Sequence, residues 1–207
     1  MLSLRLKTIA SLVKKDAKVL DVGTDHAYLP IFLQKNHLCQ SVIASDISKG
    51  AFEKAKENVE KYNCDIKLYL TDGLNNIDEE YDTLVIAGMG TLSIIHILAD
   101  QTLPDNIILS SNNNMYELRT FMNKIGYQIE KEIICKDQEK YYDIIAYQKG
   151  HEKLSDVELR FGKSNNSEYF NYLYEKELNI YKSLSFKNKM KKKTNLKKLE
   201  QLAKQKK

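Results

Sequence analysis

The sequence predicts an α/β protein, with a mainly parallel sheet of seven strands covered by helices on both faces and followed by a helical C-terminal region. Up to residue 150, short β-prone runs alternate with amphipathic helical patterns, which is typical of a doubly wound sheet. After Gly150 the β-prone runs stop, and apolar residues recur at every third or fourth position, which indicates packed helices.

The first element is an amphipathic helix over residues 3–14, where Leu6, Ile9 and Val13 recur at helical spacing. Seven strands follow, near residues 18–22, 41–45, 66–70, 82–87, 106–111, 127–135 and 141–148. The helices between them are expected over residues 28–36, 48–62, 91–99 and 114–125. Only the short polar turn Lys136–Lys140 separates the last two strands, so these should form an antiparallel hairpin.

A polar break at Ser164–Ser167 divides the chain into a domain of residues 1–163 and a C-terminal domain of residues 164–207. Two apolar stripes in the second domain predict a helical hairpin. Residues 151–207 carry 15 Lys and Arg against 7 Asp and Glu, whereas residues 1–150 carry 17 against 21. This basic tail favours a polyanion such as nucleic acid as partner, and a merely solvated helix surface is the alternative.

Composition limits the other classes of function. The three cysteines lie far apart, without a CxxC pair and without a histidine at the spacing of metal ligands, so we expect no disulfide framework and no metal. No apolar stretch approaches the roughly 20 residues that span a bilayer. We therefore expect a monomeric cytoplasmic protein without a membrane partner.

The turn after the first strand is the most informative segment. Lys18–Val22 is apolar enough for a buried strand, and Gly23 then allows the backbone to approach a ligand closely. The dinucleotide fingerprint G-x-G-x-x-G is absent, and Asp25 stands where a pyrophosphate would need an amide. A positively charged sulfonium ligand suits this turn better, and Asp21 could accept a hydrogen bond from a cationic group.

Three further strands end in polar or glycine-containing turns, and the carboxyl ends of parallel strands share one edge of a sheet. Asp46 could bind ribose hydroxyls, although it could instead cap the next helix, a role that Ser48 can also fill. Asp72 could accept the exocyclic amine of an adenine. The predicted cofactor-binding residues are Asp21, Gly23, Thr24, Asp46, Ile47, Asp72, Gly73, Ala87, Gly88 and Met89.

These motifs resemble those of class I S-adenosylmethionine-dependent methyltransferases, and more narrowly the bacterial family that methylates N1 of adenine 22 in tRNA. The residues that carry the resemblance are Asp21–Pro30, Ala44–Asp46, Ala55 with Asn58, Asp72–Leu74, Ile86–Gly90, Leu118–Arg119 and Lys140–Ile145. The resemblance runs over roughly residues 3–163. It implies a Rossmann-like sheet, S-adenosylmethionine as cofactor, tRNA as substrate and a coiled-coil-like helical C-terminal domain.

The predicted catalytic residues are Asp25, His26, Tyr28 and Asn112. N1 of adenine has a free lone pair at neutral pH, so positioning can supply much of the catalysis. Asp25 would stabilise the positive charge of the methylated base, Tyr28 would stack on it, and His26 or Asn112 would hydrogen-bond to it. The structural alternatives are a helix cap for Asp25, core packing for Tyr28 and a polar turn for His26.

Three other functions compete with this one. A methyltransferase acting on a small molecule would keep the fold and make the basic tail incidental. A nucleic-acid-binding module without catalysis would have lost affinity for the cofactor. An NAD-dependent dehydrogenase is disfavoured by the missing second and third glycines of the fingerprint.

Overall fold

The computed structural model describes residues 2–184 and 186–204, and for residues 186–191 it describes only the backbone. The chain divides into two compact units, Met1–Lys153 and Leu154–Lys207. Within the described residues, no helix is both long enough and apolar enough to cross a membrane.

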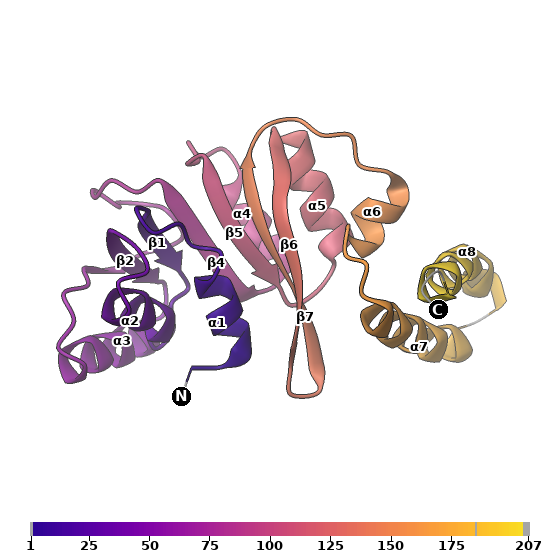
Figure 1. The fold of residues 1–207 in the computed structure, drawn as a ribbon, viewed down its shortest axis with the longest axis horizontal. Helices are drawn as coiled ribbons and strands as arrows, with labels where there is room; N and C mark the ends of the chain where they lie inside the picture. Colours follow the sequence, from indigo (N-terminus) through magenta and orange to yellow (C-terminus); the bar gives the residue numbers. More distant parts are fainter. Residues whose placement is uncertain (1, 185, 205–207) are drawn as a thin grey trace. The chain divides into compact units, whose positions relative to one another are not determined.

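The first unit is built on a seven-stranded sheet (Figure 1). The strands are β1 (Lys18–Val22), β2 (Ser41–Asp46), β3 (Leu68–Leu70), β4 (Thr83–Met89), β5 (Asn106–Ser111), β6 (Tyr127–Asp137) and β7 (Lys140–Lys149). Their order is β3-β2-β1-β4-β5-β7-β6, with β1 to β5 parallel and β7 antiparallel to both of its neighbours. The direction of strand succession reverses between β1 and β4, and such a point is where open α/β sheets bind ligands.

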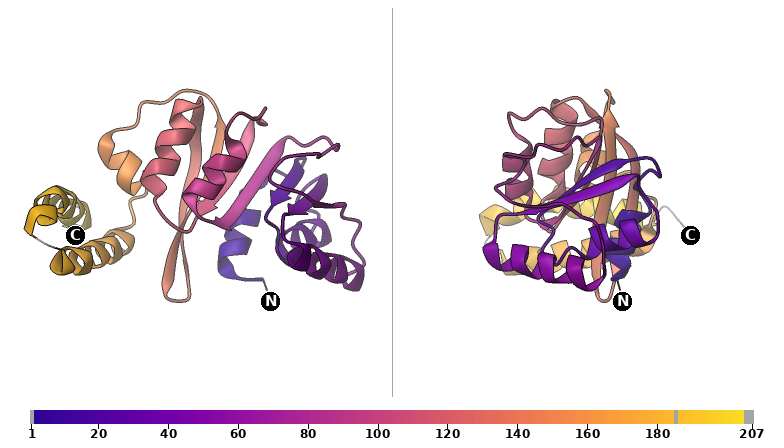
Figure 2. Two further views of the ribbon diagram at one scale, coloured as in Figure 1. Left: turned by 180° about the vertical axis from the view of Figure 1, so that it is seen from behind. Right: turned by 90° about the vertical axis from the view of Figure 1, so that its left-hand side faces the viewer.

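Helices cover both faces of the sheet (Figures 1 and 2). The helices of this unit are α1 (Leu4–Ala10), α2 (Tyr28–Lys35), α3 (Lys49–Lys61), α4 (Thr91–Leu98) and α5 (Met115–Lys124). Val19 and Val85 face the core beneath α1, α2 and α3, whereas Leu20 and Leu84 face the core beneath α4 and α5. Because both faces are buried, these strands are apolar throughout, which confirms the predicted α/β sheet.

The observed elements differ from the predicted ones mainly at their ends. Helix α1 ends at Ala10 because Leu12 and Val13 bond back in tighter three-residue turns before the chain enters β1. Strand β3 begins at Leu68, although the carbonyl of Lys67 already accepts a bond from Ala44. The hairpin of β6 and β7 is longer than predicted and closes at Gln138 and Glu139.

A buried group of charges joins α5 to this hairpin. Arg119 Nη2 lies 2.5 Å from Glu132 Oε1 and 2.7 Å from Asp143 Oδ1. The three side chains are 1%, 2% and 8% exposed. Charges buried to this degree must be paired to be tolerated, so the cluster fixes α5 against β6 and β7.

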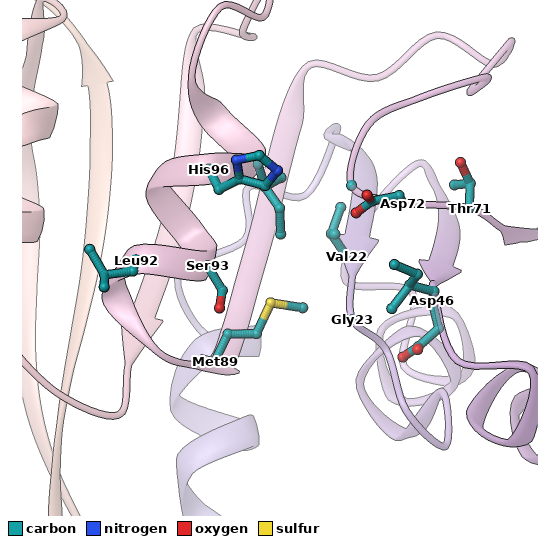
Figure 3. A pocket seen from close by; sticks show the side chains of 12 residues that line it. Val22, Gly23, Asp46, Thr71, Asp72, Met89, Leu92, Ser93 and His96 are labelled. Atoms are coloured by element: carbon teal, nitrogen blue, oxygen red, sulfur yellow. The ribbon is translucent and has the colours of Figure 1, made fainter.

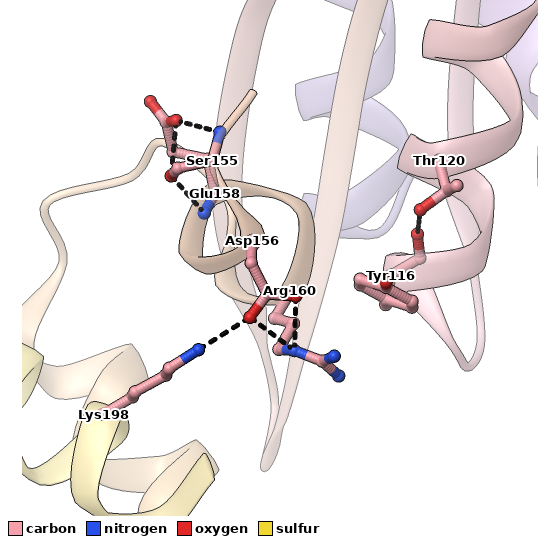
Figure 4. Close-up of polar contacts among 7 residues, drawn as sticks. All are labelled: Tyr116, Thr120, Ser155, Asp156, Glu158, Arg160 and Lys198. Carbon is pink, nitrogen blue, oxygen red and sulfur yellow. Dashed lines mark hydrogen bonds and ion pairs between the residues drawn. The ribbon is translucent and has the colours of Figure 1, made fainter. Parts of the chain in front are cut away.

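The second unit contains three helices, α6 (Asp156–Phe161), α7 (Ser167–Ser183) and α8 (Phe186–Lys204). The sequence did not predict α6, which starts with a capping box in which Ser155 and Glu158 bond each other's backbone (Figure 4). Asp156 pairs with Arg160 and with Lys198 of α8 (Figure 4).

Helices α7 and α8 form the predicted hairpin and bury Tyr169, Phe170, Leu196 and Leu199. The structure groups residues 154–163 with these helices, whereas the sequence analysis placed them in the first domain. The domain boundary at residue 163 stays a prediction.

Candidate active site

The turn between β1 and α2 is tightly wound. The backbone N–H groups of Gly23 and Thr24 both donate to the carbonyl of Ser45, at 2.8 and 3.0 Å. Asp25 and Ala27 each have φ at 55°, in the left-handed region that residues with a side chain rarely adopt. Backbone strain of this kind gathers at functional sites, and this turn lies at the carboxyl edge of the sheet.

Glycine suits position 23, because its φ lies in the left-handed region and a side chain there would displace the methyl group of Met89. A Cβ built on Gly23 would lie 2.0 Å from Met89 Cε, and its φ is 72°. Met89 ends β4, directly after Gly88 at φ 86° and at an irregularity in the pairing of β4 with β5. The side chain of Met89 therefore lies against Gly23, at the ends of the neighbouring strands β1 and β4.

A cavity of about 480 Å³ opens on one side of this contact (Figure 3). Asp46 and Asp72 contribute carboxylates, and the exposed side chains of Ile47 and Leu92 contribute apolar walls. The cavity is lined by Val22, Gly23, Asp46, Ile47, Thr71, Asp72, Gly73, Met89, Leu92, Ser93, His96 and Ile97. Apolar walls with a few placed polar groups are typical of a nucleoside or cofactor site.

A second cavity, of about 310 Å³, shares Gly23 and Met89 with the first. It is more polar, and its charged groups are Arg5, Asp21 and Asp25. Its lining residues are Arg5, Leu6, Asp21, Gly23, Thr24, Asp25, His26, Tyr28, Leu29, Ala87, Gly88 and Met89. The two cavities together bring all ten predicted cofactor-binding residues to one edge of the sheet.

Asp46 holds the turn together. Its Oδ2 accepts from the backbone N–H of Asp25 at 3.0 Å, and its Oδ1 accepts from Ser48 at 2.9 Å. Ser48, not Asp46, caps α3, because its hydroxyl accepts from Ala51. The alternative interpretation of Asp46 as a helix cap is therefore wrong, and its carboxylate faces the larger cavity.

Asp21 is buried, with 5% of its surface exposed. Burial raises the pKa of Asp21 to about 6, against a hydrogen bond from Thr24 Oγ1 that lowers it, and the charge of Asp46 adds to the rise. A buried carboxylate whose ionised form is disfavoured in this way is stabilised by a cationic ligand.

Asp25, His26 and Tyr28 form an exposed group at the mouth of the smaller cavity. Asp25 Oδ2 lies 2.7 Å from His26 Nδ1, and the rings of His26 and Tyr28 stack with centroids 5.3 Å apart. Ala27 is the residue before α2, and no side chain of the described residues caps that helix. Because the side chain of Asp25 is 70% exposed and Tyr28 is 47% exposed, the capping and core-packing alternatives are both excluded.

Asn112 lies beside the site but lines neither cavity. Its Nδ2 donates to the carbonyl of Gly88 at 2.6 Å, and its backbone N–H donates to Met89 at 2.9 Å. The side-chain amide is therefore already used to hold the β4 turn, and Oδ1 is the atom that could accept from an adenine amine. A role of Asn112 at the base stays a prediction.

Several lining residues were not predicted from the sequence: Arg5, Leu92, Ser93, His96 and Ile97. Leu92 and His96 are one helical turn apart on α4, on the exposed side opposite the buried Ile94 and Leu98. The available signal was the composition of α4, in which apolar residues also occupy positions outside the buried face. Arg5 gave no local signal, because only the fold brings α1 to the ends of β1 and β4.

The two neighbouring cavities, which share Gly23 and Met89, suit an elongated ligand that has a nucleoside at one end and a charged group at the other. Among the described residues, no group of three or more His, Cys, Asp or Glu side chains could hold a metal ion. The side chains that line the two cavities include carboxylates, the guanidinium of Arg5, the imidazoles of His26 and His96, and the ring of Tyr28.

Comparison with known proteins identifies the family. Residues 2–145 match the model of the family described as "Methyltransferase domain". This chain belongs to that methyltransferase family. It is 36% identical over 156 residues to the tRNA (adenine(22)-N(1))-methyltransferase of Bacillus subtilis, a match that spans 72% of this chain and 66% of the relative.

Solved structures resemble the methyltransferase over nearly its whole length. A putative tRNA (m1A22) methyltransferase of Streptococcus pneumoniae, in complex with S-adenosyl-L-methionine, superposes with a TM-score of 0.89 and 29% identity, covering 98% of this chain and 100% of that chain. TrmK of M. capricolum, in complex with S-adenosyl-homocysteine, has a TM-score of 0.87 and 28% identity, covering 98% of both chains. The shared fold thus includes the C-terminal helices.

Proposed function

We propose that this enzyme transfers a methyl group from S-adenosylmethionine to N1 of adenine 22 in tRNA. The observation that carries the proposal is the pair of neighbouring cavities at the carboxyl edge of the sheet, with Asp46 and Asp72 on one side of Gly23 and Asp25 on the other. The similarity to the tRNA (adenine(22)-N(1))-methyltransferase of Bacillus subtilis, and to the cofactor-bound structure from Streptococcus pneumoniae, supports it.

The residues present fit the cofactor. Asp46 would accept hydrogen bonds from the ribose hydroxyls, and Asp72 would accept a hydrogen bond from the adenine amine. Ile47 and Leu92 would flank the adenine ring. Asp21 would face the cationic end of the cofactor. Bound there, S-adenosylmethionine supplies an electrophilic methyl group. The chain's own task is then to bring the target base into line and to exclude water.

Asp25, His26 and Tyr28 would act on the target base. An adenine turned out of the RNA stack can lie on the exposed ring of Tyr28, which His26 supports from its other face. N1 needs no base to remove a proton before it attacks. Methylation places a positive charge over N1 and N6, and the carboxylate of Asp25 would stabilise this charge as it develops.

Asp46→Asn should weaken cofactor binding more than other single changes in the larger cavity. The side-chain oxygen of asparagine can still accept from one backbone N–H of the turn. The ribose hydroxyls, however, lose a charged acceptor, and a hydrogen bond to a charged group contributes about 1.5 to 3 kcal/mol. Calorimetry with S-adenosylhomocysteine should therefore show a dissociation constant about 10 to 100 times higher. Equal affinities for the variant and the wild type would remove Asp46 from the ribose site.

Cofactor binding should strengthen as the pH rises through the pKa of Asp21, about 6. Only the ionised carboxylate attracts a cationic ligand, so the dissociation constant of S-adenosylhomocysteine should fall between about pH 5 and pH 7 and then level off. The folded-state pKa lies above the ordinary value of 3.8, so the stability of the free protein should fall as pH rises across the interval between these two pKa values. Asp21→Asn should flatten both profiles, and an unchanged binding profile would contradict this role of Asp21.

The basic C-terminal unit is proposed to bind the tRNA backbone. Several of its lysines are paired: Lys192 with Glu177, Lys198 with Asp156 and Lys204 with Glu200. The exposed lysines that have no ion pair among the described residues are Lys176, Lys182, Lys193 and Lys197. The side chains of Lys187, Lys189, Lys191, Lys206 and Lys207 lie outside the described residues.

Replacing Lys176, Lys182, Lys193 and Lys197 with glutamine should weaken tRNA binding and reduce its salt dependence. Each phosphate contact contributes about 0.7 to 0.9 to the slope of log affinity against log salt, so the loss of even two contacts is measurable by filter binding. Affinity for S-adenosylhomocysteine should not change, because none of these residues lines either cavity.

A matched control removes four exposed lysines from α2 and α3 instead, namely Lys35, Lys54, Lys56 and Lys61. The control has the same net charge as the test variant and should keep most of the wild-type tRNA affinity. If both variants lose affinity and slope equally, the effect reflects total charge, and the proposed footprint on the C-terminal unit is wrong.

The reaction itself is tested by incubating the purified protein with S-adenosylmethionine and unmodified bulk tRNA, followed by mass spectrometry of the nucleosides. The expected product is 1-methyladenosine. Methylation of another nucleoside, or of no RNA at all, would contradict the proposed function. We also propose that the enzyme acts as a monomer in the cytoplasm, where bacterial tRNA is found.

A further inference from the structure

Asn58, on α3, holds the turn that carries Asp25 and His26. Its Nδ2 donates to the backbone carbonyl of His26 at 3.0 Å, and its side chain is half-buried. Asn58 lines neither cavity, so it does not touch a ligand held there. Any influence of Asn58 on the reaction must therefore pass through the turn.

The carbonyl of His26 needs this side chain because of the residue four positions further on. A helical turn would supply a backbone donor there, but the residue is Pro30, which has no N–H. The next carbonyl, that of Ala27, receives its helical bond from Ile31 at 3.0 Å. Since Ala27 is fully buried, an unpaired carbonyl beside it would cost free energy. The amide of Asn58 replaces the donor that Pro30 lacks.

Asn58 and Asp46 hold the turn from its two ends. Asp46 accepts from the N–H of Asp25 at 3.0 Å and so fixes the peptide before Asp25, whereas Asn58 fixes the peptide after His26. Between these bonds the backbone is strained, with Asp25 and Ala27 both at φ 55°. Such conformations persist only where the surrounding structure imposes them. The two side chains therefore impose the direction in which the Asp25 carboxylate leaves the backbone.

We propose that Asn58 is a positioning residue for methyl transfer. By fixing the carbonyl of His26, it aims the Asp25 carboxylate, which lies 2.7 Å from the His26 ring, at the target base. The inference rests on the proposed function, in which this pair acts on the adenine. Because Asn58 contacts neither cavity, its loss should misdirect the pair and leave the cofactor site intact.

The test replaces Asn58 with leucine, which has a similar size but no donor. Single-turnover methylation of tRNA at saturating cofactor and tRNA should slow by about 10 to 100 times, as expected when reacting groups are slightly misplaced. By calorimetry, the dissociation constant of S-adenosylhomocysteine should change less than about twofold. Asn58→Gln, which keeps the amide, should recover part of the rate.

A double variant shows whether Asn58 acts through Asp25. Residues that act as one unit do not give additive losses, so in the Asp25→Asn background Asn58→Leu should slow the reaction less than about threefold. If Asn58→Leu costs the same factor in both backgrounds, it acts on the fold rather than on Asp25, and the proposal is wrong.

Asn123→Leu is the matched control. Asn123 is also a half-buried asparagine near the end of a helix, and its Nδ2 donates to the backbone carbonyl of Glu152 at 2.9 Å. Because it lines neither cavity, its variant should keep the wild-type rate and affinity. A wild-type rate for Asn58→Leu, or equal losses of rate in the two variants, would overturn the proposal.

Amide hydrogen exchange, followed by NMR, tests the clamp without any substrate. The N–H of Asp25 should exchange at least about ten times faster in Asn58→Leu than in the wild type or in Asn123→Leu. Unchanged exchange would contradict the proposal. A wild-type protein that methylates no tRNA would contradict the proposed function, and this exchange measurement would still decide whether Asn58 holds the turn.

Discussion

Replacing Arg119 with leucine is expected to lower the free energy of unfolding of the first unit by about 3 to 5 kcal/mol. The substitution leaves the carboxylates of Glu132 and Asp143, which are 2% and 8% exposed, buried without their cation. The cost therefore comes from two buried carboxylates that have lost the Arg119 cation, rather than from one lost surface ion pair. Urea unfolding followed by circular dichroism measures it directly.

The control for this prediction is Lys14→Met. Lys14 pairs with Glu130 at 3.3 Å, but the two side chains are 53% and 38% exposed, so the change should stay within about 1 kcal/mol. Replacing Arg119, Glu132 and Asp143 together by apolar residues of similar volume should recover much of the stability lost in Arg119→Leu. A loss for Arg119→Leu no larger than for Lys14→Met would show that the cluster is not what holds α5 to the hairpin.

Asp25→Asn should reduce the rate of methyl transfer by about 100 to 1,000 times, the usual effect of removing one group that stabilises transition-state charge. Asparagine is nearly isosteric and tolerates the left-handed conformation at φ 55°. The backbone N–H that donates to Asp46 is also kept. Single-turnover rates should fall while the affinity for S-adenosylhomocysteine stays close to that of the wild type.

Asp100→Asn provides the matched control for this change. Asp100 is also an exposed aspartate with positive φ, at 58°, but it follows the far end of α4 and lines neither cavity. The Asp100→Asn variant should transfer the methyl group at the wild-type rate. A wild-type rate for Asp25→Asn would remove Asp25 from the chemistry, and an equal loss of cofactor affinity and rate would assign it to binding instead.

The sheet was predictable because the apolar sequences of its strands reflect their burial on both faces. Residues such as Val19 and Leu20 face opposite cores, so the strands are apolar throughout and stand out against the polar turns. The turns after β1 to β4 were predictable as a site for a related reason, since parallel strands place their carboxyl ends at one edge. The resemblance to a methyltransferase family then indicated which reaction to expect at this edge of the sheet.

Other features depended on contacts between distant parts of the sequence. Arg5 reaches the site only because α1 packs beside β6 and β7, and no local pattern records that packing. Helix α6 was missed although the capping box of Ser155 and Glu158 was readable, because six residues are too few to show an apolar period. The position of the Asn112 amide was equally hidden, since its hydrogen bond to the carbonyl of Gly88 joins the loop after β5 to the end of β4.

We propose that the two neighbouring cavities position adenine 22 of tRNA for methylation at N1. Two transcripts of one tRNA, one with adenine at position 22 and one with guanine there, test this positioning when each is incubated with the enzyme and S-adenosylmethionine. Mass spectrometry of nuclease fragments should find 1-methyladenosine at position 22 of the first transcript and no added methyl group in the second. Equal methylation of both transcripts, or methylation of the first at another position, would contradict the claim.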